Sequence, residues 1–351
     1  MVLLATLFLA AVIFLLRWGL GHRPSPGYWI KTGMALLLLS PVCLFGLVPI
    51  GIGWIGPSLV GTRGDESFYA GPWISEDGTW IIQVRRRSNQ PVVSPPQDIR
   101  PIADYKRELF SEDGLRLSSY LVPPEGVEAK ISVVLVHGLF RGGLELESIA
   151  TMFRDLGAEV LMLELRDHGG SDRGIFTFGR DESLDVVAAV EWLRSQGRQQ
   201  IVLFGISLGS AAAVLACDRL QGIAGLVLDA PMDDLLKTAH RVLGSTQVNI
   251  PQPFRSIILT AMEWRMGMSL SEVKPKQCLA RLPMDMPVLL IGGERDYRMP
   301  PEVVQGIFDG LAASDDLKEI WIRPGSGHGS VSHDDPEGYR QRLTRFLAKL
   351  R

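Results

Sequence analysis

The first residue that could carry out chemistry is a serine between two glycines. In the segment 205–209 (Gly-Ile-Ser-Leu-Gly), Ser207 follows an apolar stretch at 201–204 and precedes a run of small residues at 211–216. This order predicts a buried strand that turns sharply into a helix, with the serine raised above the sheet. A serine hydroxyl becomes a nucleophile when a base removes its proton. The segment therefore predicts nucleophilic acyl transfer.

A histidine and a carboxylate that suit this chemistry occur later in the chain. Asp296 follows the predicted strand Val288 to Ile291, and His328 follows the predicted strand Ile320 to Ile322. The carboxyl ends of parallel strands meet at one edge of a sheet, so the three side chains are expected close together. There the histidine can act as base and the carboxylate can orient it. We expect Ser207, His328 and Asp296 to form a catalytic triad.

Neighbouring residues offer alternatives for each of these roles. Glu294 stands shortly before Asp296 and is the alternative acid, while His333 is the alternative base. His333 is the weaker choice because it stands farther from the strand, beside a predicted helix start. For Ser207 the alternative is a tight turn with no chemistry.

Acyl transfer also requires N–H donors for the developing oxyanion. One donor is expected from Leu208, directly after the nucleophile. The second is expected from the glycine-containing loop 137–143, with the Leu139 N–H as first choice and the Phe140 N–H as alternative. His137, at the start of this loop, is expected to hydrogen-bond loop backbone rather than to transfer protons.

The elements that position these residues alternate between strand and helix from Lys106 onward. The segments Arg107 to Phe110 and Leu115 to Leu121 predict an antiparallel pair at the sheet edge, joined by a turn at 112–114. Apolar strands then alternate with helices, which predicts a mainly parallel sheet covered on both faces. The further predicted strands are Val133 to Val136, Val160 to Leu165, Ile201 to Phe204, Gly225 to Leu228, Val288 to Ile291 and Ile320 to Ile322. The predicted helices are Leu144 to Leu156, Asp181 to Ser195, the one after Ser207, Pro301 to Leu311 and Pro336 to Leu350.

An insertion at about 232–286 interrupts this alternation. It is too long for an ordinary connection and carries two or three predicted helices, so we expect a small helical cap over the carboxyl edge of the sheet. Apolar residues between Phe254 and Met268 are expected to pack on the core of the insertion. If part of this surface faced the site, an acyl chain would be the expected guest.

Two apolar runs precede the domain and predict a transmembrane hairpin with helices at about 2–20 and 33–57. The second run has no charged residue and exceeds the roughly 20 residues that cross a bilayer. The first lacks a preceding basic residue and a convincing cleavage site, which favours an uncleaved anchor over a signal peptide. Arg17, Arg23 and Lys31 lie between the runs, which predicts a cytoplasmic connection and an extracytoplasmic catalytic domain.

The remaining composition restricts the partners. The formal net charge of −3 at pH 7 argues against a general nucleic-acid binder. The segment 61–105, which mixes aromatic residues, turn formers and prolines, predicts a strand-rich linker. The three cysteines form neither a metal-ligand spacing nor a disulfide framework. Free thiols at Cys217 and Cys278 are favoured, and a bridge between these two stays open.

Five motifs together resemble the α/β-hydrolase superfamily, most closely its serine aminopeptidase-like, membrane-anchored branch. They are His137-Gly138, Asp167-His168-Gly169-Gly170-Ser171, the segment 205–209, Gly293-Glu294-Arg295-Asp296 and Gly327-His328. The resemblance covers about Lys106 to Leu350 and implies a serine hydrolase acting on esters, thioesters or peptides without a metal or organic cofactor. The chain departs from some relatives at 139–141, where Leu-Phe-Arg replaces small residues.

These observations predict an α/β-hydrolase domain at 106–351 behind a transmembrane hairpin. The expected reaction is cleavage of a carboxylic ester, with small-molecule or lipid acyl esters as candidate substrates and membrane lipid as a partner of the N-terminal helices. A thioesterase or a serine peptidase would use the same triad. A binding module without catalysis is the alternative of a different class.

Overall fold

The structure is a computed structural model, and it describes most of the chain after residue 104. The described residues are 49–51, 69–74, 80–84, 100–101, 105–124, 126–139, 142–245 and 248–350. Within these ranges, no helix has the length and apolar character needed to cross a membrane. The transmembrane helices predicted at 2–20 and 33–57 lie outside the described residues, except for the helical residues 49–51.

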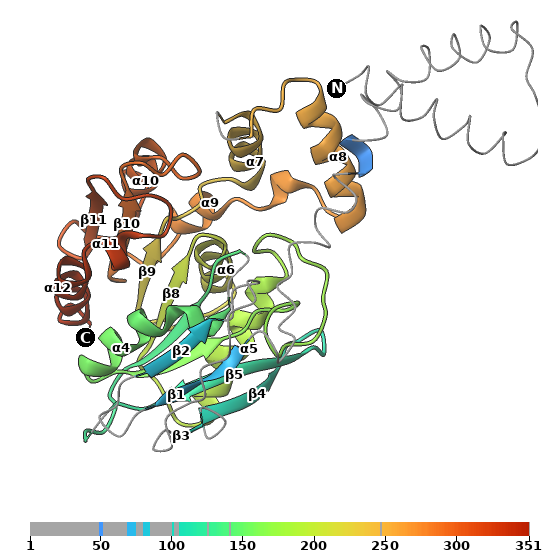
Figure 1. Cartoon of the computed structure of the whole chain (residues 1–351). Helices are drawn as coiled ribbons and strands as arrows, with labels where there is room; N and C mark the ends of the chain where they lie inside the picture. Colours follow the sequence, from blue (N-terminus) through green and yellow to red (C-terminus); the bar gives the residue numbers. More distant parts are fainter. Residues whose placement is uncertain are drawn as a thin grey trace, which may run out of the picture. The chain divides into compact units, whose positions relative to one another are not determined.

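An eight-stranded sheet forms the centre of the domain (Figure 1). Its strands are β4 (Lys106–Phe110), β5 (Arg116–Val122), β6 (Ser132–Val136), β7 (Glu159–Leu163), β8 (Ile201–Ile206), β9 (Gly225–Asp229), β10 (Val288–Gly293) and β11 (Lys318–Arg323). Their order across the sheet is β11-β10-β9-β8-β6-β7-β5-β4. The pairs β4–β5 and β5–β7 are antiparallel and the others are parallel. The predicted mainly parallel sheet with an antiparallel edge is confirmed.

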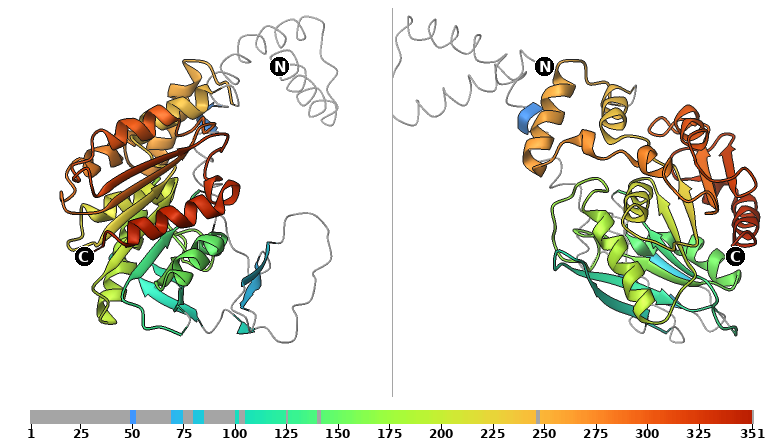
Figure 2. Two further views of the ribbon diagram at one scale, coloured as in Figure 1. Left: turned by 90° about the vertical axis from the view of Figure 1, so that its left-hand side faces the viewer. Right: turned by 180° about the vertical axis from the view of Figure 1, so that it is seen from behind.

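Helices cover both faces of this sheet, as the apolar strands require. Among the described residues, the helices of the sheet-containing unit are η4 (Gly143–Leu146), α4 (Glu147–Asp155), α5 (Glu182–Ser195), α6 (Leu208–Cys217), α7 (Leu235–Gly244), η5 (Leu270–Glu272), α9 (Pro275–Leu279), α10 (Pro301–Phe308), α11 (Val331–Asp334) and α12 (Pro336–Leu347). A further helix, α8 (Phe254–Met266), lies within the insertion. Figure 2 shows helices on both sides of the sheet. One core cluster contains residues of α5, α6, α9 and α10, and the other contains residues of α4 and α12.

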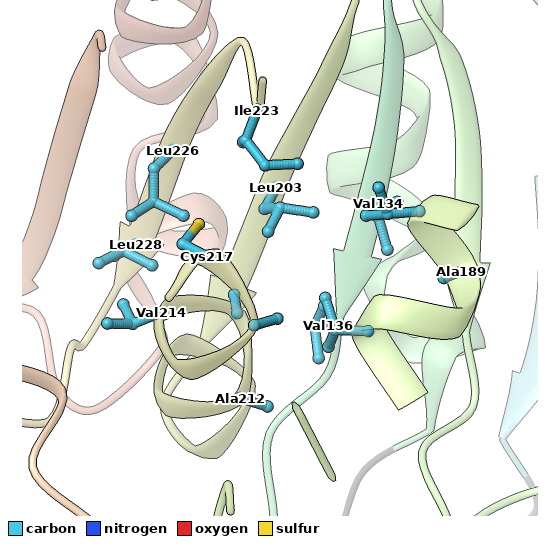
Figure 3. Packing of buried hydrophobic residues seen from close by; sticks show 14 of the residues in the cluster. Val134, Val136, Ala189, Leu203, Ala212, Val214, Cys217, Ile223, Leu226 and Leu228 are labelled. Atoms are coloured by element: carbon cyan, nitrogen blue, oxygen red, sulfur yellow. The ribbon is translucent and has the colours of Figure 1, made fainter. Parts of the chain in front are cut away.

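The helix that follows the predicted nucleophile packs closely against the central strands. Figure 3 shows Cys217 of α6 beside Leu203 of β8, and Val214 of α6 beside Leu228 of β9. These residues and Ala212 of α6 are members of one buried cluster. The small side chains of α6 let its axis approach the sheet, because an alanine adds only one carbon to the contact. This packing fixes the start of α6, and with it the turn that precedes the helix.

Some predicted boundaries differ from the observed ones. The helix predicted from Leu144 is divided, since a 3-10 turn (η4) precedes α4. Gly143 lies so close to the end of β7 that an added Cβ would be 2.9 Å from the Leu163 carbonyl oxygen. Contact with the sheet therefore decides the course of the chain here, which helical periodicity does not reveal.

The chain forms two compact units. One contains, of the described residues, 49–51 and those within Leu243–Gly267, and the other contains the rest. The predicted cap at 232–286 is therefore shared between the units. Within α8, four apolar side chains are buried, whereas Trp264 is 79% exposed.

Two smaller predictions concern the linker and the cysteines. Three short strands within 61–105 form an antiparallel sheet of order β2-β1-β3. They are β1 (Tyr69–Ile74), β2 (Trp80–Val84) and β3 (Arg100–Pro101). Cys217 and Cys278 are both buried free thiols, so the bridge left open between them is not formed.

Candidate active site

Ser207 occupies a tight turn between β8 and α6. Its φ of 54° and ψ of −114° are unusual for a residue with a side chain, and the Ser207 N–H donates to the Asp229 carbonyl oxygen at 2.8 Å. Glycines are required on both sides of the turn. A Cβ on Gly205 would collide with the backbone of Gly209, and one on Gly209 would collide with the Val136 carbonyl group. The turn holds the serine where strand, helix and neighbouring strand meet.

His328 links the serine to a carboxylate. Its Nε2 lies 2.8 Å from Ser207 Oγ, and its Nδ1 lies 2.7 Å from Asp296 Oδ2. An ionised carboxylate only accepts hydrogen bonds, so Nδ1 carries the proton of a neutral ring and Nε2 is left to accept from the serine hydroxyl. The Asp296 side chain has no exposed surface and that of His328 is 15% exposed. The structure thus brings the three predicted residues into one hydrogen-bonded chain.

The Asp296 carboxylate is held in place by its own loop. Oδ1 accepts the N–H groups of Arg298 and Met299 at 2.9 and 3.0 Å. These two bonds leave Oδ2 for the histidine.

The alternative acid and base lie elsewhere. The Glu294 carboxylate accepts the Gly325 N–H through Oε2 at 2.8 Å, and His333 is exposed on α11. The carboxylate that contacts His328 Nδ1 is that of Asp296. The geometry therefore favours Asp296 over Glu294 and His328 over His333.

The two predicted oxyanion donors follow neighbouring strands. Leu208 is the first residue of α6, so its N–H has no acceptor within the helix and lies at the positive end of the helix dipole. Leu139 is in the loop after β6, partly buried against the core. Phe140, the alternative donor, lies outside the described residues.

His137 has the structural role that its position predicts. It is fully buried, and its Nε2 accepts the Leu165 N–H at 3.1 Å. Nδ1 therefore carries the ring proton and donates to the Gly138 carbonyl oxygen at 2.9 Å. Both nitrogens are used by backbone at the start of the oxyanion loop.

Three polar side chains beside the nucleophile were not identified from the sequence. The Ser210 hydroxyl donates to the Ser207 carbonyl oxygen. Asp229, whose own carbonyl oxygen binds the Ser207 N–H, accepts the Tyr339 hydroxyl at 3.0 Å. Burial and the neighbouring carboxylate raise the pKa of Tyr339 well above its usual value. A signal for Asp229 exists in the sequence, because a carboxylate ends an otherwise apolar strand at the edge that carries the triad candidates.

The described residues contain no group of three or more His, Cys, Asp or Glu side chains arranged to hold a metal ion.

Comparison with known proteins places this chain in a family. Residues 133–342, more than half of the chain, match the alpha/beta hydrolase family. The chain belongs to the α/β-hydrolase family. Membership supports a hydrolase, whereas the predicted serine aminopeptidase-like, membrane-anchored branch stays a prediction.

This α/β hydrolase has curated and structural relatives at low identity. It is 23% identical over 245 residues to the uncharacterized protein YqkD of Bacillus subtilis. The match covers 68% of this chain and 77% of the relative. An esterase from Pyrococcus furiosus matches with a TM-score of 0.59 and 22% identity, covering 75% of this chain and 97% of the esterase. The α/β hydrolase GrgF from Penicillium matches with a TM-score of 0.55 and 20% identity, covering 70% and 98%. These structural likenesses show the fold.

Proposed function

We propose that this α/β hydrolase is a serine hydrolase that cleaves carboxylic esters through an acyl-enzyme intermediate. The observation that carries the proposal is the hydrogen-bonded chain from Asp296 through His328 to Ser207. Each member lies at the carboxyl edge of the sheet, on the turn after β8, β10 or β11. The esterase activity of the Pyrococcus relative is a property of that protein and is consistent with the proposed reaction.

In the first half of the reaction, Ser207 Oγ attacks the carbonyl carbon of the ester while His328 Nε2 takes its proton. Asp296 orients the ring and stabilises the imidazolium through Nδ1. The N–H groups of Leu208 and Leu139 bind the oxyanion of the tetrahedral intermediate, each contributing a few kcal/mol. The intermediate expels the alcohol, which receives the proton from His328.

In the second half, water attacks the acyl-enzyme. His328 takes a proton from the water, and Leu208 and Leu139 again bind the oxyanion. Collapse of the second intermediate releases the carboxylic acid and returns the proton to Ser207. The site residues contribute nucleophilic catalysis, general acid–base catalysis and oxyanion binding to this sequence.

Labelling with a fluorophosphonate probe tests the proposal. The probe phosphonylates an activated serine, so the wild-type chain should be labelled within minutes and Ser207→Ala should not be. Ser195→Ala is the control, since Ser195 is an exposed serine at the end of α5. An unlabelled wild type would favour the binding-module alternative and reject catalysis.

Hydrolysis assays distinguish the proposed esterase activity from thioesterase and peptidase activity. We expect turnover of p-nitrophenyl esters over a series of acyl lengths, with Ser207→Ala as the blank. A thioester and an aminoacyl amide are assayed beside them. Preference for either one by kcat/KM would replace the esterase proposal with a thioesterase or a peptidase, which use the same triad.

The membrane anchor is part of the proposal and rests on the sequence. Apolar runs at 2–20 and 33–57, with basic residues between them, support two transmembrane helices and an extracytoplasmic catalytic domain. Lipid acyl esters would then lie close to the enzyme. A reporter fused to the C-terminus should be active on the outer side, and reporter activity in the cytoplasm would reverse the proposed orientation.

A further inference from the structure

An arginine of the insertion contacts the loop that carries the triad acid. Arg241, on α7, donates from Nη1 to the Arg298 carbonyl oxygen at 2.7 Å. The two residues are 57 positions apart in the chain and belong to the same compact unit. The bond therefore joins the part of the insertion before residue 243 to the turn after β10.

Arg241 is itself held in place within the insertion. Its Nη2 forms an ion pair with Asp233 Oδ1 at 3.4 Å, and its Nη1 lies 3.4 Å from Thr238 Oγ1. Its side chain is 24% exposed and that of Asp233 is 16% exposed. The backbone of Asp233 is bonded in turn, since its carbonyl oxygen accepts the Lys276 N–H at 3.1 Å. The guanidinium group is thus a fixed donor rather than a mobile surface charge.

The residue that Arg241 binds is also the residue that fixes the acid. The Arg298 N–H donates to Asp296 Oδ1 at 2.9 Å, while its carbonyl oxygen accepts from Arg241. A shift of this residue would move the donor that sets the carboxylate orientation. Asp296 Oδ2 would then move relative to His328 Nδ1, which lies 2.7 Å away.

We propose that Arg241 is a positioning residue for catalysis, which orients Asp296 toward His328 by holding the backbone of Arg298. This inference rests on the proposed serine hydrolase mechanism and adds a residue to it. Arg241 acts through the turn after β10, which carries Asp296 and Arg298, and does not touch the substrate carbonyl in this mechanism. Its loss should slow acylation of Ser207 and leave substrate binding intact.

Three variants of α7 test the inference. Arg241→Met keeps most of the apolar stem and removes the donor, so kcat should fall about tenfold, as expected for one lost hydrogen bond, with KM within about twofold. Arg241→Lys restores a single donor and should recover part of the loss. Lys237→Ala is the control, because Lys237 is exposed on the same helix. Wild-type kcat in Arg241→Met would overturn the proposal.

A double-mutant cycle with Asp296→Asn separates positioning from a general structural effect. The readout is the rate constant for fluorophosphonate labelling, measured under conditions in which urea unfolding shows each variant to be fully folded. If Arg241 acts through Asp296, Arg241→Met should slow wild-type labelling about tenfold and the Asp296→Asn variant less than twofold. The same fold loss in both backgrounds would reject the inference.

The two proposals fail in different ways. If the wild type does not react with the probe, the serine hydrolase mechanism is wrong, and the positioning role is rejected with it. If the wild type reacts and the cycle is additive, the mechanism stands and only the role of Arg241 is rejected.

Discussion

The Tyr339 hydroxyl donates to the Asp229 carboxylate at 3.0 Å, and neither residue has exposed surface. Tyr339 belongs to α12, near the end of the chain, while Asp229 ends β9 beside the nucleophile turn. The Asp229 carbonyl oxygen also accepts the Ser207 N–H. The last helix of the domain is therefore connected to the predicted nucleophile through one residue.

Tyr339→Phe should destabilise the domain. It removes the hydroxyl donor from a buried carboxylate, and such a loss costs about 1–3 kcal/mol. Urea unfolding measures the change in the free energy of unfolding. Tyr297→Phe is the control, because Tyr297 is 37% exposed and a surface change of this kind is expected within about 0.5 kcal/mol. Equal effects of both variants would contradict a role for the buried bond.

Asp296→Asn should reduce kcat by about a thousandfold or more, because an amide cannot hold His328 in the required tautomer and does not stabilise the imidazolium. Glu294→Gln should stay within a few fold of the wild type, since the Glu294 carboxylate accepts the Gly325 N–H and not His328. Steady-state hydrolysis of a p-nitrophenyl ester measures both. The reverse ranking would make Glu294 the acid.

Gly209→Ala should destabilise the turn around Ser207 by about 3 kcal/mol, at the upper end of the cost of overpacking, or prevent folding. The added Cβ would meet the Val136 and His137 carbonyl groups, and backbone cannot move aside as a side chain can. Gly306→Ala is the matched control within a helix, where the nearest atom is the flexible Lys276 Nζ at 3.6 Å. It should stabilise by up to about 1 kcal/mol, measured by urea unfolding, because alanine favours helix over glycine.

Glu147 should make stability depend on pH. Burial raises the pKa of this side chain, at the start of α4, from 4.5 to about 7. Between about pH 4.5 and pH 7 the folded state binds more protons than the unfolded state, so the free energy of unfolding falls as pH rises through this window.

The Glu147→Gln variant removes this titration. The difference in the free energy of unfolding between Glu147→Gln and the wild type should shift in favour of the variant by about 1–2 kcal/mol from pH 5 to pH 8. This value is reduced because solvent partly screens the side chain. Urea unfolding at the two pH values gives the difference. An identical pH dependence of variant and wild type would show that Glu147 is ionised in the folded state throughout.

The positions of the strands and the mainly parallel character of the sheet follow from local sequence patterns. Buried strands such as β8 and β10 are continuous apolar runs, and such runs between helices are covered on both faces. The turn at Ser207 was likewise predictable, because its glycines are required by contacts within a few residues and with the adjacent strand. The predicted helix from Leu144 was less accurate, since its first turn follows the surface of β7.

The sequence favours Asp296 over Glu294 as the acid of the proposed triad, and the tertiary structure supplies the physical reason. Glu294 and Asp296 both stand at the carboxyl end of β10 and both carry a carboxylate. Asp296 is selected by two loop N–H groups that turn one oxygen toward His328. Those bonds depend on how the loop folds back, which has no periodic signal in the sequence.

The sequence by itself determined the residue types of the site, their order along the chain and the sheet edge on which they lie, because a strand-to-helix turn and apolar strands are local features. Only the tertiary structure decided which side chains meet. Ser207 and His328 are 121 positions apart, and Arg241 and Tyr339 reach the site from other elements. Contacts over such separations arise from the packing of whole helices on the sheet, so no short segment encodes them.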